Sequence, residues 1–175
     1  MKRKGLTILA AMLVVLMAFT AFGCRRKSDD PKGGNGDKII IGGAMSMTGI
    51  QAPLDSPAME GIEVAIAELN EKGGIDGKLL EFRNMDSKSD SATASEVAKQ
   101  LVDQGAVAII TSSDYDFGGP AARAAQEAGI VGISSNASSP LFGSTMLGDL
   151  QFTLSMWNTT MGAVIAEKAY VEDGL

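Results

Sequence analysis

GIEVAIAELNEKGGIDGKLLEF, residues Gly61–Phe82, places an amphipathic segment, a glycine pair and an apolar run in direct succession. Four apolar residues of its first part recur at the i, i+3, i+4, i+7 spacing of one helix face. The spacing predicts a helix over residues 58–72. The apolar residues that define this face are Ile62, Ala65, Ile66 and Leu69.

The second part of this stretch ends the helix and begins a strand. Gly73-Gly74 stops the helix, and Asp76-Gly77 predicts a tight turn. The apolar run that follows predicts a strand over 79–85. Upstream, residues 38–44 read KIIIGGA, a short run rich in β-branched residues that is typical of a strand buried on both faces. We expect a loop over 45–57 between this strand and the helix.

The same alternation of strand and helix continues downstream. Strands alternating with amphipathic helices indicate βαβ units, and therefore an α/β fold with a parallel sheet flanked by helices. We expect Ala94, Val97, Ala98 and Leu101 to face inward from the second helix, and Ala121, Ala124, Ala125 and Ala128 from the third. The further predicted helices are 92–104, 118–128 and 159–171, and the further predicted strands are 106–110, 130–133 and 150–154.

Four predicted loops follow the carboxyl ends of the first four strands, and all are rich in Ser, Thr, Asp, Gly or Asn. They begin at Met45, Asp86, Thr111 and Ser134. Because ligands of open parallel sheets bind beyond the carboxyl ends of the strands, these loops are the candidate binding site.

The N-terminus has the layout of a secretory signal. Lys2, Arg3 and Lys4 precede an apolar run over 6–22, and Gly23 and Cys24 follow it. Residues 21–24, Ala-Phe-Gly-Cys, resemble the lipobox of bacterial lipoproteins, although Ala21 stands where leucine is usual. The resemblance implies that 1–23 is a lipoprotein signal peptide and that Cys24 is acylated. We interpret 24–37 as a flexible polar tether. Two alternatives are a membrane-spanning anchor, for which the run is short, and cleavage by ordinary signal peptidase that leaves a free thiol.

Composition argues against several classes of function. The chain has 175 residues, a net charge of −6 and no histidine. Residues 1–23 contain three basic and no acidic side chains, so 24–175 has a charge of −9, which argues against nucleic-acid binding. Without histidine there is no Ser-His or Cys-His nucleophile and no zinc-histidine site. No phosphate-cradling glycine motif follows the first strand. We therefore expect that the protein is not an enzyme and that it binds neither a cofactor nor a metal.

Four segments of residues 38–175 form one further pattern. In chain order they are Ile39–Gly42 with Met47-Thr48-Gly49, Gly61–Phe82, Asp86–Asp90, and Ala128–Ile130 with Ile133-Ser134 and Ala137–Pro140. In this order and spacing they resemble the periplasmic binding protein family of the leucine/isoleucine/valine-binding type, and the resemblance covers nearly all of residues 38–175. The stretch Gly61–Phe82 is the most specific of the four, since it resembles the family's helix, Gly-Gly-Ile turn and second strand.

The resemblance implies a type I periplasmic-binding-protein fold of two lobes that close on a ligand. Residues 38–175 would form an incomplete part of it, namely most of the first lobe and the crossover into the second. It implies an extracytoplasmic receptor that binds an amino acid or similar small polar solute for the permease subunits of an ABC importer. Lipid on Cys24, as predicted from the N-terminus, would anchor this receptor to the membrane. The alternatives are a ligand-sensing domain of a signalling system on the same fold or, less favoured, an enzyme.

The resemblance also implies ligand contacts at Thr48, at the N–H of Ala137 and at the hydroxyl of Ser138. Two positions depart from the amino-acid-binding pattern. Asp114 and Tyr115 replace serines, and Asn158 replaces an aspartate that pairs with the ligand ammonium.

These departures leave several interpretations open. The carboxylate of Asp114 either repels a ligand carboxylate or caps the following helix, where an acid suits the dipole. Tyr115 can stack on or hydrogen-bond a ligand, and for Trp157 we favour a place in the core. An amide, a sugar-like, a cationic or an aromatic ligand therefore stays as open as a branched-chain amino acid.

Overall fold

The computed structural model of the chain describes residues 38–174. Three features predicted from the sequence lie outside the described residues: the signal peptide 1–23, the tether 24–37 and the acylation of Cys24. None of the helices in the described part of the chain combines the length and hydropathy that crossing a membrane requires.

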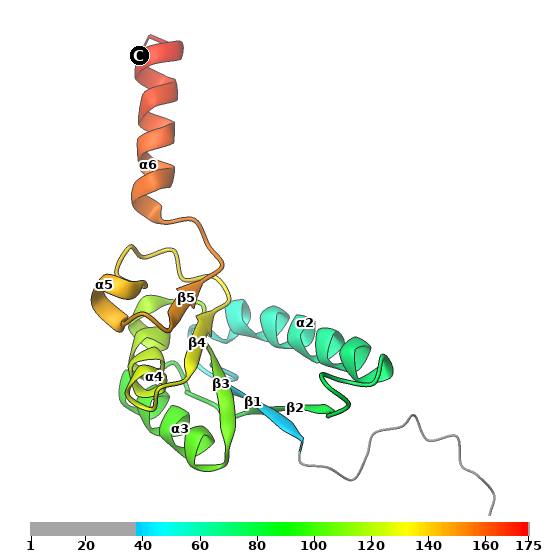
Figure 1. Ribbon diagram of the computed structural model, residues 1–175. Helices are drawn as coiled ribbons and strands as arrows, with labels where there is room; N and C mark the ends of the chain where they lie inside the picture. The colour runs from blue at the N-terminus through cyan, green and yellow to red at the C-terminus, as the bar shows by residue number, and fades with distance from the viewer. Residues whose placement is uncertain (1–37, 175) are drawn as a thin grey trace, which may run out of the picture. The chain divides into compact units, whose positions relative to one another are not determined.

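A five-stranded sheet organises the described residues, with the order β2-β1-β3-β4-β5 and every neighbouring pair parallel (Figure 1). The parallel α/β architecture expected from the strand and helix pattern is confirmed. The strands are β1 (Ile39–Ala44), β2 (Leu80–Asn84), β3 (Ala106–Thr111), β4 (Val131–Ser134) and β5 (Gln151–Thr153).

Helices connect these strands. Helix α5 follows the predicted loop that begins at Ser134, in a stretch where no helix was expected. No residue of the last α-helix, α6, is buried. The helical elements are α2 (Ala52–Glu71), α3 (Ser91–Asp103), α4 (Tyr115–Glu127), α5 (Ser144–Leu147), α6 (Asn158–Glu167) and the π-helix η1 (Lys168–Glu172).

Helices α3 and α4 cover one face of the sheet and form the main core with it (Figure 1). All four residues expected to face inward from α3 are buried, which confirms that prediction. In α4 the prediction is wrong at Ala128, which is the exposed C-cap, whereas Ala122 is buried. Small alanine side chains let the two helices approach the sheet closely.

Helix α2 begins at Ala52, six residues before the predicted start. Pro53 lies in its first turn, where a missing N–H costs no helical bond, and the helix continues through Pro57. We had interpreted this proline-containing stretch as a loop. In the same way α4 begins at Tyr115 rather than residue 118, because Asp114 caps it.

The face of α2 that was expected to be buried is only partly so. Ile62 and Ile66 are half-buried, but Ala65 and Leu69 are exposed, so the prediction is wrong for these two residues. The helix packs chiefly against the edge strand β2, which has neighbours on one side only. An edge strand offers less apolar surface than the centre of a sheet.

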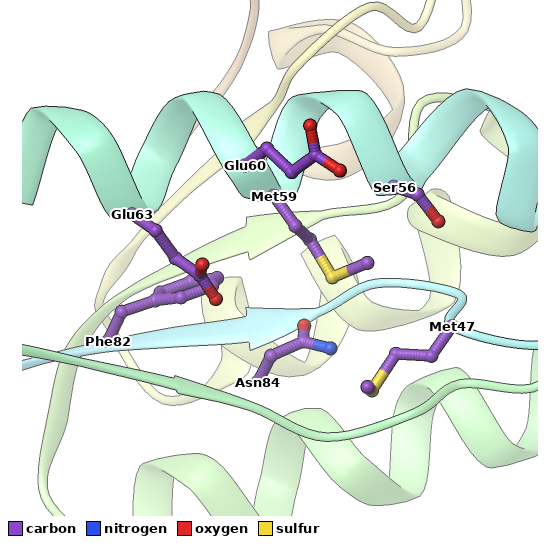
Figure 2. Close-up of a pocket in the computed structure, with 7 residues that line it drawn as sticks. All are labelled: Met47, Ser56, Met59, Glu60, Glu63, Phe82 and Asn84. Atoms are coloured by element: carbon purple, nitrogen blue, oxygen red, sulfur yellow. The ribbon is translucent and has the colours of Figure 1, made fainter.

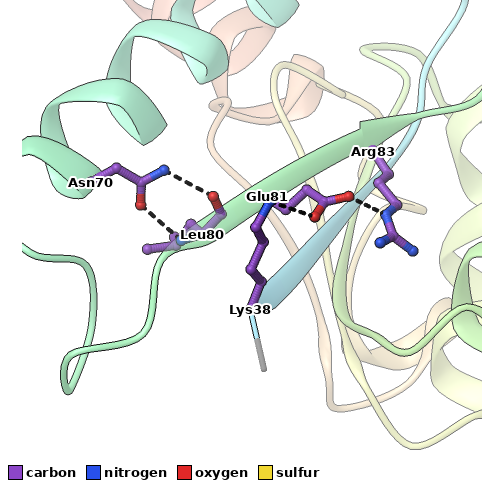
Figure 3. Close-up of polar contacts among 5 residues, drawn as sticks. All are labelled: Lys38, Asn70, Leu80, Glu81 and Arg83. Atoms are coloured by element: carbon purple, nitrogen blue, oxygen red, sulfur yellow. Dashed lines mark hydrogen bonds and ion pairs between the residues drawn. The ribbon is translucent and has the colours of Figure 1, made fainter. Parts of the chain in front are cut away.

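The junction between α2 and β2 has the predicted turn (Figure 3). The Nδ2 group of Asn70 donates to the carbonyl of Leu80 at 2.9 Å, and the N–H of Leu80 donates to Asn70 Oδ1 at 2.7 Å. Gly74 has a φ of +76°, and a Cβ there would overlap the carbonyl oxygen of Lys78. Only glycine fits this turn, so the Gly-Gly pair sets where β2 starts.

Candidate functional site

The carboxyl ends of all five strands lie at one edge of the sheet, because every neighbouring pair is parallel. Hydrogen bonds between side chains and backbone join the loops at this edge. We call the joined groups the edge network. Its members are Ser46, Asp55, Ser87, Ser112, Ser113, Ser134, Ala137 and Thr153.

Asp55, in the first turn of α2, is the charged centre of the edge network and is completely buried. Its Oδ2 accepts from the N–H of Ser46 at 2.7 Å. Its Oδ1 accepts from the N–H of Ser113 at 2.9 Å and from the hydroxyl of Ser113 at 2.7 Å. A buried carboxylate is stable only when such donors surround it, so Asp55 holds the ends of β1 and β3 together.

Two further bonds extend this contact. The hydroxyls of Ser46 and Ser87 lie 2.9 Å apart, which brings in the loop after β2. The Nε2 group of Gln51 donates to the hydroxyl of Ser113 at 2.7 Å. Three loops are thus fixed by buried polar groups, which makes this end of the sheet a preorganised surface.

The loops after β3, β4 and β5 are joined in the same manner. The hydroxyl of Ser134 donates to the carbonyl of Ser112 at 2.9 Å and accepts from the N–H of Ala137 at 3.0 Å. The hydroxyl of Thr153 donates to the carbonyl of Ala137 at 2.6 Å. The edge network therefore reaches all five strand ends.

Thr48, a predicted ligand contact, lies exposed on the loop after β1. Its hydroxyl donates to Asp86 Oδ2 at 2.7 Å. Burial acts to raise the pKa of Asp86, but hydrogen bonds from the Thr48 hydroxyl and from the N–H groups of Lys88, Met47 and Thr48 hold that pKa below its usual value of 3.8. Asp86 therefore stays ionised near neutral pH and fixes the position of Thr48.

Of the two interpretations of Asp114, the structure supports helix capping. Asp114 is the N-cap of α4, and its Oδ1 accepts from the N–H of Asp116 at 2.8 Å. Tyr115 is half-buried, packs against the cluster that contains Ala137, and accepts a hydrogen bond from Arg123 at 2.9 Å. The Asp114 carboxylate thus satisfies one backbone N–H in the first turn of α4, a group that has no partner within the helix.

Ala137, Ser138 and Asn158 lie together. Ala137 is buried, and its N–H donates to Ser134, as described above. The carbonyl of the half-buried Ser138 accepts from the N–H of Asn158 at 2.8 Å. Trp157 is 44% exposed, so our assignment of this residue to the core is wrong. The roles of these residues in ligand binding stay predictions.

Two hollows of the surface are lined by residues described above, and a third lies elsewhere. Tyr115 lines one hollow of about 460 Å³ with Arg123, and Trp157 lines another of about 360 Å³ with Thr153. A third hollow, of about 410 Å³, lies between α2 and β2, where Met59 points toward Asn84 (Figure 2). None of the six predicted ligand contacts lines this third hollow.

Asp55, Ser46, Ser113 and Ser134 lie in loops that were predicted to form the site, but none of the four was singled out. Asp55 was placed inside the predicted loop 45–57, where an acid is usually solvated. Ser46, Ser113 and Ser134 lie within three residues of the ends of predicted strands, and polar groups there meet at one edge, so their positions were the signal that could have found them. A helix start at Ala52 would have placed Asp55 beside them.

A family model and similar proteins of known name indicate the same family for this chain. The model of the family described as periplasmic binding protein matches residues 38–172. The Leu/Ile/Val/Thr-binding protein of Salmonella typhimurium is 31% identical over 137 residues, 78% of this chain and 34% of that protein. The Leu/Ile/Val-binding protein homolog 1 of Brucella abortus is 29% identical over 147 residues, 83% of this chain and 34% of that protein.

A solved structure shares the fold. It is that of the branched-chain amino acid transporter substrate binding protein from Streptococcus pneumoniae in complex with isoleucine, with a TM-score of 0.70 and 29% identity. The match covers 77% of this chain and 38% of that chain. The chain thus spans about a third of the length of the curated relatives it matches.

Proposed function

The chain belongs to the periplasmic binding protein family, and from this premise we propose that it is the ligand-binding part of an extracytoplasmic solute receptor. The receptor delivers an amino acid or a similar small polar solute to the permease subunits of an ABC importer. The relatives support the amino-acid class of ligand, since two of them are named for binding leucine, isoleucine and valine and the solved structure is of a substrate binding protein of a branched-chain amino acid transporter.

The observation that supports this proposal most directly is the edge network. Its buried hydrogen bonds fix in place the loops that carry the predicted ligand contacts Thr48 and Ser138. Receptors gain affinity from donors that are already ordered before the ligand arrives, because little entropy is then lost on binding. Ser138 and Asn158, joined by a backbone bond, are the groups that we propose contact the ligand from the loops after β4 and β5.

A thermal-shift screen followed by calorimetry tests this function. L-leucine, L-isoleucine and L-valine, their amides and simple sugars are the probes. We expect at least one amino acid to raise Tm. Ser138→Ala should weaken the binding of that amino acid about 10- to 150-fold, because a hydrogen bond to a charged group contributes about 1.5–3 kcal/mol. Ser95→Ala is the matched control, since Ser95 is half-buried like Ser138 but lies on α3 and lines none of the hollows described above. Binding of sugars alone would contradict the proposal.

We also propose that Cys24 is acylated and anchors the receptor to the outer face of the cell membrane. Cys24 is the only cysteine of the sequence and lies just after the apolar run 6–22. Intact-mass measurement after expression in bacteria detects the added lipid. Cys24→Ala should remove that mass and move the protein from the membrane to the soluble fraction, and an unchanged distribution would count against anchoring.

A further inference from the structure

Asp55 is the one fully buried ionisable side chain among residues 38–174, and the proposed function gives it no contact with the ligand. All three of its hydrogen-bond partners donate to it: two backbone N–H groups and one hydroxyl, from Ser46 and Ser113. The hydroxyl of Ser113 in turn accepts from Gln51. No cationic side chain is a partner of the Asp55 carboxylate in these bonds.

This set of donors has the composition of a carboxylate-binding site. Backbone N–H groups and hydroxyls that converge on two oxygens bind a carboxylate in charge-assisted hydrogen bonds. The donors come from the ends of β1 and β3, two neighbouring strands at the edge where the proposed ligand binds. The side chain that fills the site comes from a third element, α2.

We infer that Asp55 is a built-in carboxylate that fills an anion site formed by Ser46 and Ser113, and so determines specificity by withholding these donors from any ligand. A ligand carboxylate finds its donors elsewhere along the edge, and the loop after β4 offers the hydroxyl of Ser138. This consequence for the ligand rests on the proposed function, whereas the existence of the anion site does not.

Chemical rescue tests the inference. Asp55→Ala removes the carboxylate, leaves three buried donors without a partner, and opens a space the size of formate. We expect the variant to be strongly destabilised and formate to raise its Tm by at least about 3 °C over chloride at the same ionic strength. Acetate should act more weakly, because its methyl group collides with the methyl carbon that the alanine already supplies.

Two variants serve as controls. Asp55→Asn keeps the volume of the side chain but turns one acceptor into a donor, so we expect loss of stability without rescue by formate. Asp86→Ala removes a carboxylate that also accepts from backbone N–H groups and a hydroxyl, but at the surface. Water replaces that carboxylate, so formate should have no specific effect.

The result is decisive in either direction. If Asp55→Ala does not fold in chloride, circular dichroism should recover the helical signal when formate is added. No recovery in formate, or an equal Tm rise in Asp86→Ala or the wild type, would overturn the inference. Because the test uses no ligand, a ligand screen that finds nothing leaves it intact, and a failed rescue leaves the proposed receptor function intact.

Discussion

The two faces of the sheet differ in how completely helices cover them. On one face α3 and α4 pack with β1 and β3 into a core in which Leu101 and Ile109 are fully buried. On the other face α2 buries only one residue, Asp55, and its Val64 and Leu69 are exposed. Both α2 and α3 nevertheless show the same apolar spacing in the sequence.

The difference teaches that apolar spacing predicts a helix face but not how deeply that face is buried. Helix α3 lies against β1, β3 and α4, so its apolar residues meet neighbours on several sides. Helix α2 lies chiefly along the edge strand β2. The neighbours of a helix are set by the order of the strands, and no local pattern of residues states that order.

The largest expected effect is a core truncation on each face. Leu101→Ala should lower the free energy of unfolding by about 2–5 kcal/mol, because it removes a fully buried side chain and leaves a cavity. The matched change Ile66→Ala, on the half-buried face of α2, should cost less than half as much. Urea unfolding followed by circular dichroism measures both. Equal losses would show that the two faces are equally well packed.

Much of the fold could be predicted from the sequence, because short β-branched runs and glycine turns act locally. The Gly73-Gly74 pair and the Asp76-Gly77 turn fix the start of β2, as expected. The start of α2 could not be predicted, since Pro53 and Pro57 are typical of loops. Pro53 fits the first turn of a helix, whereas Pro57 lies inside α2 and would usually argue against a helix there.

The candidate site was harder to predict than the fold. The loops at the strand ends were expected to form it, and the edge network lies there. Asp55 was missed because an acid in a polar loop is usually solvated, and its burial depends on Ser46 and Ser113, one of them 58 residues away. Asp114 was left between two roles, since the choice depends on where α4 begins.

Two adjacent glycines of β1 sharpen the comparison, because their missing side chains would point to opposite faces. A Cβ at Gly42 would lie 2.7 Å from Ile109 Cδ1 and 3.2 Å from Leu101 Cβ, both fully buried. A Cβ at Gly43 would overlap Asn84 Oδ1 and lie 2.6 Å from Phe82 Cζ; both residues are half-buried as a whole, although the amide end of Asn84 is buried. Of these four contacted residues, only Phe82 and Asn84 border open space, in the hollow between α2 and β2.

We therefore expect Gly42→Ala to cost about 1–3 kcal/mol by overpacking the core and Gly43→Ala to cost clearly less. The midpoints of thermal and urea unfolding for the two variants give the comparison. A larger loss for Gly43→Ala would mean that the face under α2 is the more rigid of the two.

The smallest expected effect concerns the caps of the two helices. The N-cap of α3 is Asp90, which accepts from the hydroxyl of Thr93 at 2.6 Å and from its N–H at 2.7 Å, whereas the N-cap of α2, Gln51, makes no side-chain cap bond. These bonds from Thr93, the hydroxyl first and then the N–H, hold the pKa of Asp90 below its usual value of 3.8. A carboxyl whose pKa is lowered by folding stabilises the folded state at pH values above the unfolded pKa. That stability is lost as the pH falls through the folded pKa.

Wild-type stability should therefore fall as the pH drops from about 5 toward 2, and Asp90→Asn should flatten part of this fall while keeping a capping side chain. Thr93→Ala keeps the acid but removes the hydroxyl donor, so the folded pKa of Asp90 lies closer to its usual value, and the fall should be smaller and end at a higher pH. Urea midpoints measured across this range decide the matter. If Asp90→Asn and the wild type lose stability in parallel, the Asp90 cap contributes nothing to the pH dependence. The difference between the two faces of the sheet then depends on the apolar contacts of α3 and not on its cap.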